Sequence, residues 1–259
     1  MREVQTTVSG RELNYYEDFY SGEAQRHFAK PAVVAFRRHL AGRILTAARL
    51  GPTSRVLSIG CGVGDTELLL APHIGEITGV DLSPRAIEQA NRDAGARGIH
   101  NARFHVAAWQ DFAAAGSRFD AVLAIFFLHH LDARDLEQAP AQLRSLLAPG
   151  GRVYALDPSA RRLSGAVGRL IVPKLMAKYQ TKDERPLDPR MLSKIFENGG
   201  FSAETCWYDF VSTPMAGLFP SVPLLYRAGR IADEALTRIP LLRALSSNFE
   251  LLAVSNRRP

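Results

Sequence analysis

Strand-like and helix-like stretches alternate through the middle of the chain, and this alternation restricts the fold more than any other feature. Five apolar, strand-like runs occur, separated by segments with the spacing of amphipathic helices. Such an alternation is typical of a parallel sheet, because parallel strands need a long crossover that usually contains a helix. The runs are residues 55–60, 76–82, 102–108, 119–128 and 152–157.

Local signals place individual elements in this pattern. Ser83 and Pro84 begin a helix after the second run, with serine as the N-cap and proline at the first helical position. Glycines at 95 and 98 end that helix. The run 119–128 is the most apolar, which is expected of a strand buried on both faces at the centre of a sheet.

The ends of the chain add further elements to this core. Residues 1–50 have the pattern of helices that precede the first strand. After a helix with a glycine stop, two more strands are expected at 202–211 and 249–256. A helical insertion at 214–246, divided by prolines, separates these two strands. The sequence therefore predicts an α/β fold with a doubly wound, mostly parallel sheet.

Length and composition narrow the class of protein. A chain of 259 residues suffices for one large α/β domain and is too short for two. Its longest uncharged apolar stretch, 121–128, is far shorter than the ~20 residues that span a bilayer. The N-terminus lacks the apolar region of a signal peptide, and the isolated Cys61 and Cys206 form neither a disulfide framework nor a metal cluster. We expect a cytoplasmic protein without a metal.

A glycine turn inside the segment VLSIGCGVGDTELLL marks a candidate ligand site. Dinucleotide-binding turns have the spacing G-x-G-x-x-G. Here Gly60, Gly62 and Gly64 alternate, and Asp65 takes the place of the third glycine. Asp81 follows at the end of the second run, where a carboxylate can accept both hydroxyls of a ribose. The pattern favours a nucleoside over a pyrophosphate, although a tight turn with a helix-capping acid would use the same residues.

Four segments match one known family in order and spacing: VLSIGCGVGD, ITGVDLSP, FDAVLAIFFLHHL and LLAPGGRVYALD. Together they resemble the class I S-adenosylmethionine-dependent methyltransferases. The resemblance implies S-adenosylmethionine as the cofactor and a Rossmann-like sheet of seven strands, the last of them antiparallel. It divides the chain into an N-terminal helical cap (1–50), a cofactor-binding core (51–157) and a remainder of the same domain (158–259).

The resemblance also assigns the cofactor site. The turn 60–64 is expected to hold the methionine part and Asp81 the ribose. Leu82 is expected to pack on the adenine, and the turn 107–109 to contact its edge. The implied cofactor-binding residues are Gly60, Cys61, Gly62, Gly64, Asp81, Leu82, Ala108, Trp109, Ala124 and Ile125.

Two positions depart from the family pattern. The family usually has an acid two residues before the first glycine, where this chain has Ser58. The acid that often contacts the adenine amino group aligns with Ala108, and the following Trp109 is a candidate to replace that contact by stacking. These departures predict weaker cofactor binding or compensation by another segment. They also leave open a non-catalytic protein that binds the cofactor.

Candidate catalytic and acceptor-binding residues flank this site. Methyl transfer is an in-line displacement from a sulfonium, so the protein must orient two reactants and exclude water. Phe127 is a candidate aromatic face beside the cation, and His129 is the candidate base. Both residues also fit ordinary roles, as a core phenylalanine and a buried, hydrogen-bonded histidine. Tyr16 is a candidate for an N-terminal lid.

Missing motifs limit the class of acceptor. The stretch after the fourth strand reads IFFLHH rather than the Asn/Asp-Pro-Pro-aromatic turn of enzymes that methylate the exocyclic amines of bases. Neither a Pro-Cys nucleophile nor an acidic metal cluster of the catechol type is present. A small-molecule acceptor remains, and the chain resembles the methyltransferases of quinone and natural-product biosynthesis.

The last part of the chain suggests the chemistry of that acceptor. Residues 158–190 contain eight Lys/Arg and three acids, and Arg162 and Arg169 are predicted to share a helix face. An apolar stripe in the helical lid 214–246 is predicted to bury against the fold. Together these features favour a lipid- or prenyl-like acceptor with an anionic group, or peripheral contact with an anionic membrane. Packing helices with a solvated basic face are the ordinary alternative.

The net charge of +6 keeps other partners under consideration. It permits an RNA or protein methyltransferase, but no aromatic and basic recognition module supports one. We therefore do not expect binding to nucleic acid.

Overall fold

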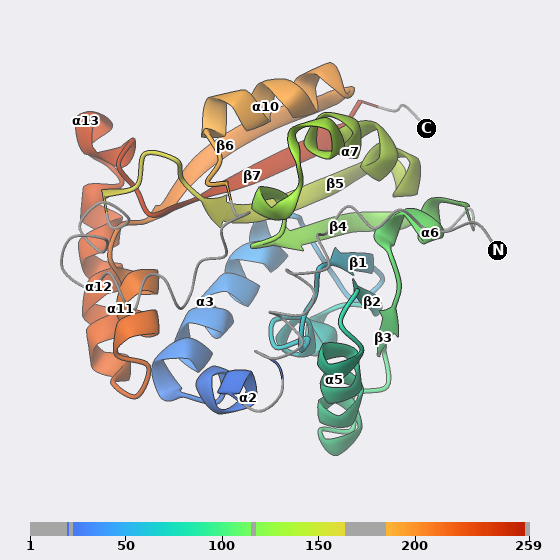
Figure 1. The fold of residues 1–259 in the computed structure, drawn as a ribbon, viewed down its shortest axis with the longest axis horizontal. Helices are drawn as coiled ribbons and strands as arrows, with labels where there is room; N and C mark the ends of the chain where they lie inside the picture. The colour runs from blue at the N-terminus through green and yellow to red at the C-terminus, as the bar shows by residue number, and fades with distance from the viewer. Residues whose placement is uncertain (1–19, 21–22, 115–117, 164–184, 257–259) are drawn as a thin grey trace.

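The computed structural model describes residues 20, 23–114, 118–163 and 185–256. A single seven-stranded sheet forms its centre, in the order β3-β2-β1-β4-β5-β7-β6 (Figure 1), which confirms the predicted fold class. The most apolar run forms the middle strand, β4, as predicted. The strands are β1 (Arg55–Ile59), β2 (Glu76–Asp81), β3 (Ala102–Val106), β4 (Phe119–Ile125), β5 (Leu147–Pro158), β6 (Phe201–Asp209) and β7 (Asn248–Ser255).

The pairing of the strands determines where a ligand can bind. β1 is parallel to both of its neighbours, β2 and β4, and the outer pairs β2–β3 and β4–β5 are parallel as well. β7 is antiparallel to β5 and β6, as the family resemblance implied for the last strand. From β1 the chain proceeds first to β2 on one side and later to β4 on the other. The carboxyl ends of β1 and β4 therefore form the topological switch point, where doubly wound sheets bind their ligands.

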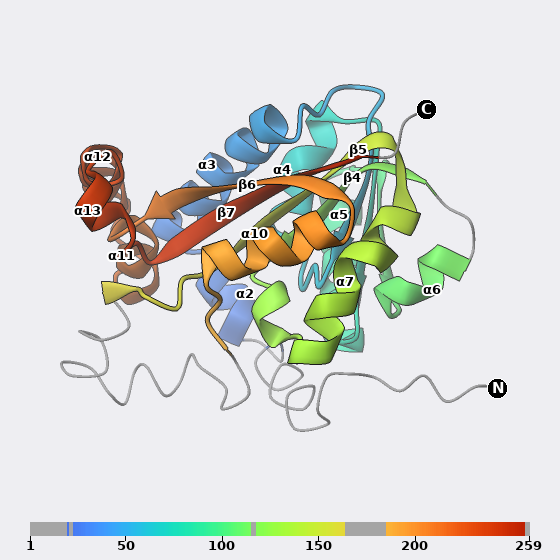
Figure 2. The same ribbon diagram turned by 90° about the horizontal axis from the view of Figure 1, so that it is seen from above.

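Helices cover both faces of the sheet (Figure 2). α3, α4 and α5 pack on one face, and α6, α7 and α10 pack on the other. Val56 belongs to the first core and Leu57 to the second, because successive residues of a strand point to opposite faces. The helices are α2 (Glu23–Phe28), α3 (Pro31–Ala47), α4 (Glu67–Leu70), α5 (Pro84–Ala96), α6 (Trp109–Ala114), α7 (Ala133–Leu146), α10 (Pro189–Asn198), α11 (Ser212–Leu218), α12 (Pro223–Leu236) and α13 (Pro240–Arg243), with short 3-10 turns η1 (Ala71–His73) and η2 (Leu128–His130).

The predicted start of α5 and its stop at Gly98 are confirmed, whereas Gly95 lies inside the helix and does not end it. The Ser83 hydroxyl accepts a hydrogen bond from the Ala86 amide at 3.1 Å, which satisfies one of the unpaired donors of the first turn. Pro84 is the first helical residue. Gly98 follows the helix with a φ of 63°, a conformation that glycine adopts without strain.

α11, α12 and α13 lie at one end of the sheet, beyond the end of β6 (Figure 1). The prediction that the apolar stripe of α12 is buried is wrong. Leu224 and Ile231 in this stripe are 71% and 73% exposed. The buried face carries Tyr226, Gly229 and Asp233 instead. Gly229 allows this face to approach the backbone of α11 closely, and Asp233 hydrogen-bonds there, so the helix turns its leucine side to solvent.

Candidate functional site

The glycine turn after β1 adopts a backbone conformation that favours glycine. Gly60, Gly62 and Gly64 have φ values of 62°, 52° and 70°. A Cβ atom at Gly60 would collide with the Phe127 ring, and one at Gly62 would lie 2.7 Å from the Tyr20 hydroxyl. Two aromatic side chains, one from beyond β4 and one from the N-terminal segment, thus pack directly against the turn.

Asp81, the last residue of β2, connects the turn to the next helix. One carboxylate oxygen accepts the Gly62 amide at 2.8 Å, and the other accepts the Ser83 amide at 2.9 Å. The side chain is half-buried, and each carboxylate oxygen can accept a second hydrogen bond. Asp81 therefore fixes the turn and can still receive ribose hydroxyls.

The residues assigned to the adenine lie around this carboxylate. The Ala107 amide donates to the Asp81 carbonyl at 3.1 Å, so the turn with the half-buried Ala108 adjoins the end of β2 and its neighbour Leu82. Trp109 is only 6% exposed and packs in the core beneath α7. The stacking of Trp109 on an adenine therefore stays a prediction.

The end of β4 brings aromatic side chains to the same edge of the sheet. Ala124 is fully buried and Ile125 is half-buried beside the switch point. Phe126 has a φ of 52°, an unusual value for a residue with a side chain, and its amide donates to the Leu156 carbonyl at 2.7 Å. This backbone turn separates two rings, since Phe126 packs towards α3 while Phe127 lies on Gly60. Backbone strain of this kind often occurs at functional sites.

His129 forms a buried pair that the sequence analysis did not include. Its Nδ1 lies 2.7 Å from a carboxylate oxygen of Asp157, and its backbone amide donates to the same oxygen at 3.3 Å. Burial raises the pKa of Asp157 to about 8, against the opposing effect of the His129 amide. The two residues are 28 positions apart and come from η2 and the end of β5. A carboxylate that orients a histidine in this way is a common arrangement for a general base.

A second buried carboxylate lies behind the glycine turn. Ser58 on β1 donates a hydrogen bond of 2.6 Å to Glu67, the first residue of α4. Burial raises the pKa of Glu67 to about 7. Nearby, Arg37 of α3 forms an ion pair with Asp65 at 2.8 Å. The side chain at the departure from the family pattern thus contacts a carboxylate from a neighbouring helix.

The other candidates are only partly described. Tyr16 and Arg169 lie outside the described residues. Arg162 is described, but it occupies a turn before Leu163 rather than a helix, and its amide donates to the Ser159 carbonyl at 3.2 Å. In the described part of the chain, no three His, Cys, Asp or Glu side chains come together as a metal site. No helix among the described residues is long and apolar enough to span a bilayer.

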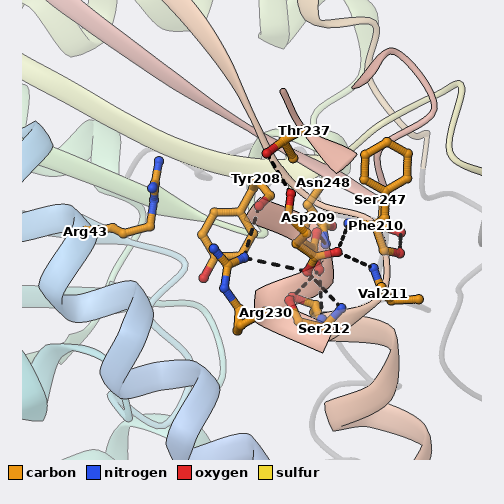
Figure 3. A network of polar contacts seen from close by, with 12 residues as sticks. Arg43, Tyr208, Asp209, Phe210, Val211, Ser212, Arg230, Thr237, Ser247 and Asn248 are labelled. Carbon is orange, nitrogen blue, oxygen red and sulfur yellow. Dashed lines mark hydrogen bonds and ion pairs between the residues drawn. The ribbon is translucent and has the colours of Figure 1, made fainter. Parts of the chain in front are cut away.

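The region predicted as a lid is fixed to the sheet by a buried polar network (Figure 3). The fully buried Asp233 carboxylate accepts the amides of Phe210, Val211 and Ser212 at 2.8, 3.0 and 3.0 Å. Arg230 lies 3.7 Å from the same carboxylate. α12 is thereby tied to the segment that links β6 to α11.

Comparison with known proteins identifies a family to which this part of the chain is similar. A family described as a methyltransferase domain matches residues 56–151, which contain all of β1 except Arg55, the glycine turn and β2 to β4. 23S rRNA (uracil(1939)-C(5))-methyltransferase RlmD of Methylococcus capsulatus is 38% identical over 74 residues, which are 29% of this chain and only 17% of that protein. The match to RlmD therefore covers a small part of both proteins.

Longer matches extend over most of the fold. Ubiquinone biosynthesis O-methyltransferase of Xanthomonas axonopodis pv. citri is 31% identical over 166 residues, which cover 61% of this chain and 67% of that protein. The structure of N-methyltransferase NodS from Bradyrhizobium japonicum, in complex with S-adenosyl-L-homocysteine, superposes with a TM-score of 0.58 at 20% identity and covers 95% of this chain and 98% of that one. The sequence match and the shared fold show that the chain belongs to the class I S-adenosylmethionine-dependent methyltransferases.

Proposed function

We propose that the chain transfers the methyl group of S-adenosylmethionine to a small, apolar acceptor. The main observation in support of this proposal is that the glycine turn, Asp81 and Phe127 lie together at the switch point of the sheet. The turn exposes backbone without side chains at its three glycines, and the carboxylate beside it suits a ribose. The name of the ubiquinone relative supports an apolar acceptor of the quinone type.

The proposed cofactor contacts follow the positions of these residues. The turn 60–64 holds the methionine part, and Asp81 accepts the ribose hydroxyls. Leu82 and Ala108 border the adenine, with Ile125 on the opposite side of the switch point. Trp109 supports this region from the core.

In the proposed chemistry, the buried pair of His129 and Asp157 takes up the proton that the acceptor loses. When bound, the cofactor supplies an electrophilic methyl carbon on a sulfonium. An attacking O–H, N–H or acidic C–H group must lose its proton, and His129 accepts it in this proposal. Its Nδ1 is engaged by Asp157, so Nε2 is the ring nitrogen that exchanges the proton. Phe126 and Phe127 exclude water from the reacting atoms.

The experiment that tests this function identifies the labelled product. The protein is incubated with S-adenosylmethionine carrying an isotopic methyl group and with cell extract, and the labelled fraction is analysed by mass spectrometry. A labelled lipophilic small molecule is expected, and the Asp81→Ala variant should not form it. Label in RNA or protein would refute the small-molecule acceptor. Cofactor binding without any labelled product would support the non-catalytic alternative.

We further propose peripheral contact with an anionic membrane, through the exposed side of α12 and α13. We call the exposed Leu224 and Ile231 of α12 and Leu241 of α13 the aliphatic patch; Leu241 is 89% exposed. Exposed arginines at 227, 238 and 243 lie on or beside the same helices. Apolar side chains bordered by arginines suit the interface of a membrane with anionic lipids.

Vesicle flotation tests the membrane contact. The protein should float with vesicles that contain phosphatidylglycerol and much less with pure phosphatidylcholine vesicles, because the arginines need anionic headgroups. Leu224→Asp combined with Ile231→Asp should abolish flotation, and the exposed Glu234→Gln should serve as the matched control. Equal flotation of both variants would refute the contact through this patch.

A further inference from the structure

The carboxylate of Glu67 is buried directly behind the glycine turn. Glu67 is 2% exposed and Ser58 is 1% exposed, so both are inaccessible to bulk water. The Ser58 hydroxyl donates to Glu67 Oε1 at 2.6 Å and fixes the direction of the carboxylate. Ser58 is the penultimate residue of β1 and lies two residues before Gly60. An acid is thus present behind the turn, but it comes from α4 instead of β1.

The ionised form of this carboxylate is balanced only in part, by the nearby Arg37, and burial raises the pKa of Glu67 to about 7. Among the described residues Glu67 forms no ion pair, and the guanidinium of Arg37 is paired with Asp65. Three carboxylates, those of Asp65, Glu67 and Asp81, lie around the turn, together with the buried thiol of Cys61. A buried charge without a partner is costly, so a cation is the ligand that this cluster favours.

We propose that Glu67, oriented by Ser58, binds a cationic group of the methionine part of the cofactor. This inference rests on the proposed function, which places that part of S-adenosylmethionine at the turn. The methionine part carries two cations, the α-ammonium and the sulfonium, and the ammonium can also donate charge-assisted hydrogen bonds to a carboxylate. Glu67 would then supply the charge that Ser58 lacks, and cofactor affinity would not suffer from that departure.

The proposal predicts a link between cofactor binding and a proton. Ser58, Asp65 and Arg37 face Glu67, and burial and Asp65 keep part of the carboxyl groups protonated near neutral pH. A cation binds the ionised form, so binding should release a proton. Affinity should therefore fall as pH decreases below about 7, approaching tenfold per pH unit.

Calorimetry with three ligands tests the proposal. S-adenosylmethionine carries both cations, S-adenosylhomocysteine carries only the ammonium, and 5′-methylthioadenosine carries neither. Glu67→Gln should weaken the first two about tenfold to a hundredfold, as expected for a hydrogen bond to a charged group, and leave the third unchanged. It should also remove the pH dependence. The control is Glu88→Gln, which changes an exposed glutamate in a surface ion pair with Arg92.

A double variant tests whether the loss of affinity in Glu67 variants has a purely structural cause. Ser58→Asp combined with Glu67→Ser exchanges the acid and the hydroxyl between β1 and α4. This double variant should bind S-adenosylmethionine at least tenfold more tightly than Glu67→Ser alone.

The outcomes separate the possible explanations. If Glu67→Gln weakens the binding of S-adenosylmethionine alone, Glu67 contacts the sulfonium, and this result still supports a cation site. Equal weakening of all three ligands, or no weakening, would overturn the inference. A wild-type protein that binds none of them would instead refute the proposed function.

Discussion

Replacing Asp233 with alanine should detach the helical segment α11–α13 from the sheet while the cofactor site stays intact. The substitution removes the acceptor of three amide hydrogen bonds, from Phe210, Val211 and Ser212. It also removes the carboxylate that lies 3.7 Å from Arg230. Asp233 has no exposed surface, so water cannot hydrogen-bond to the three amides that lose their acceptor unless the helices open.

The expected magnitude follows from these contacts. A hydrogen bond to a charged group contributes about 1.5–3 kcal/mol, but three bonds to one carboxylate are not additive. Breaking a buried pair by removing one partner costs about 3–5 kcal/mol, and we expect a loss in this range. Because a domain is stable by only about 5–15 kcal/mol, opening of α11–α13 alone becomes easier than global unfolding.

Hydrogen exchange with urea denaturation measures both effects. In the variant, amides of α11 and α12 should exchange much faster, while those near Ile59 and Leu123 change little. The matched control is Glu234→Ala, which removes the exposed acid of the adjacent position. A loss below about 1 kcal/mol, or equal losses in the variant and the control, would refute the anchoring role. In wild type, full protection of the whole segment would mean that 214–246 is a packing element and not a mobile lid.

Three further predictions concern the site. Asp81→Ala should weaken S-adenosylmethionine about tenfold to a hundredfold in calorimetry, because it removes a charged acceptor; wild-type affinity would contradict the ribose contact. Turnover should rise as pH increases through about 8, when Asp157 ionises, and Asp157→Asn should remove this rise; an unchanged profile would exclude the pair as base. The raised pKa values of Glu67, Asp157 and Asp209, about 7, 8 and 6, mean that the folded state binds more protons than the unfolded state. The free energy of unfolding should therefore fall between pH 4 and 8, and a rising curve from denaturation would contradict these shifts.

The core of the fold was predictable because its signals are local. The strand-like runs are rich in apolar residues, with eight in succession at 121–128, and the cap at Ser83 needs only the next three residues to form. The direction of the apolar stripe of α12 could not be predicted from such local signals. Periodicity shows that the helix has an apolar side, but the direction of that side depends on Gly229 and Asp233 packing against α11. Nothing in the spacing of the leucines contains that information.

The same distinction applies to the site. The glycine turn and Asp81 form a short motif in which backbone conformation and hydrogen bonding are set nearby, so their positions could be anticipated. His129 was a candidate, but its partner Asp157 lies on another strand and was not identified. Trp109 was assigned to the adenine from its position in the chain, and its burial in the core could not be read from that position. Pairs that meet across elements require the packing of the whole domain.

The net charge of the chain and the charge around the glycine turn have opposite signs, so composition alone predicts the wrong charge of ligand for this site. The chain has a net charge of +6, which on its own favours anionic ligands. Around the glycine turn, however, three carboxylates lie near the guanidinium of Arg37. These groups are partly or fully buried, so salt screens them less than the exposed arginines of α12. If the cofactor binds at this turn, as we propose, its cationic groups meet a negative local field in spite of the positive net charge of the chain.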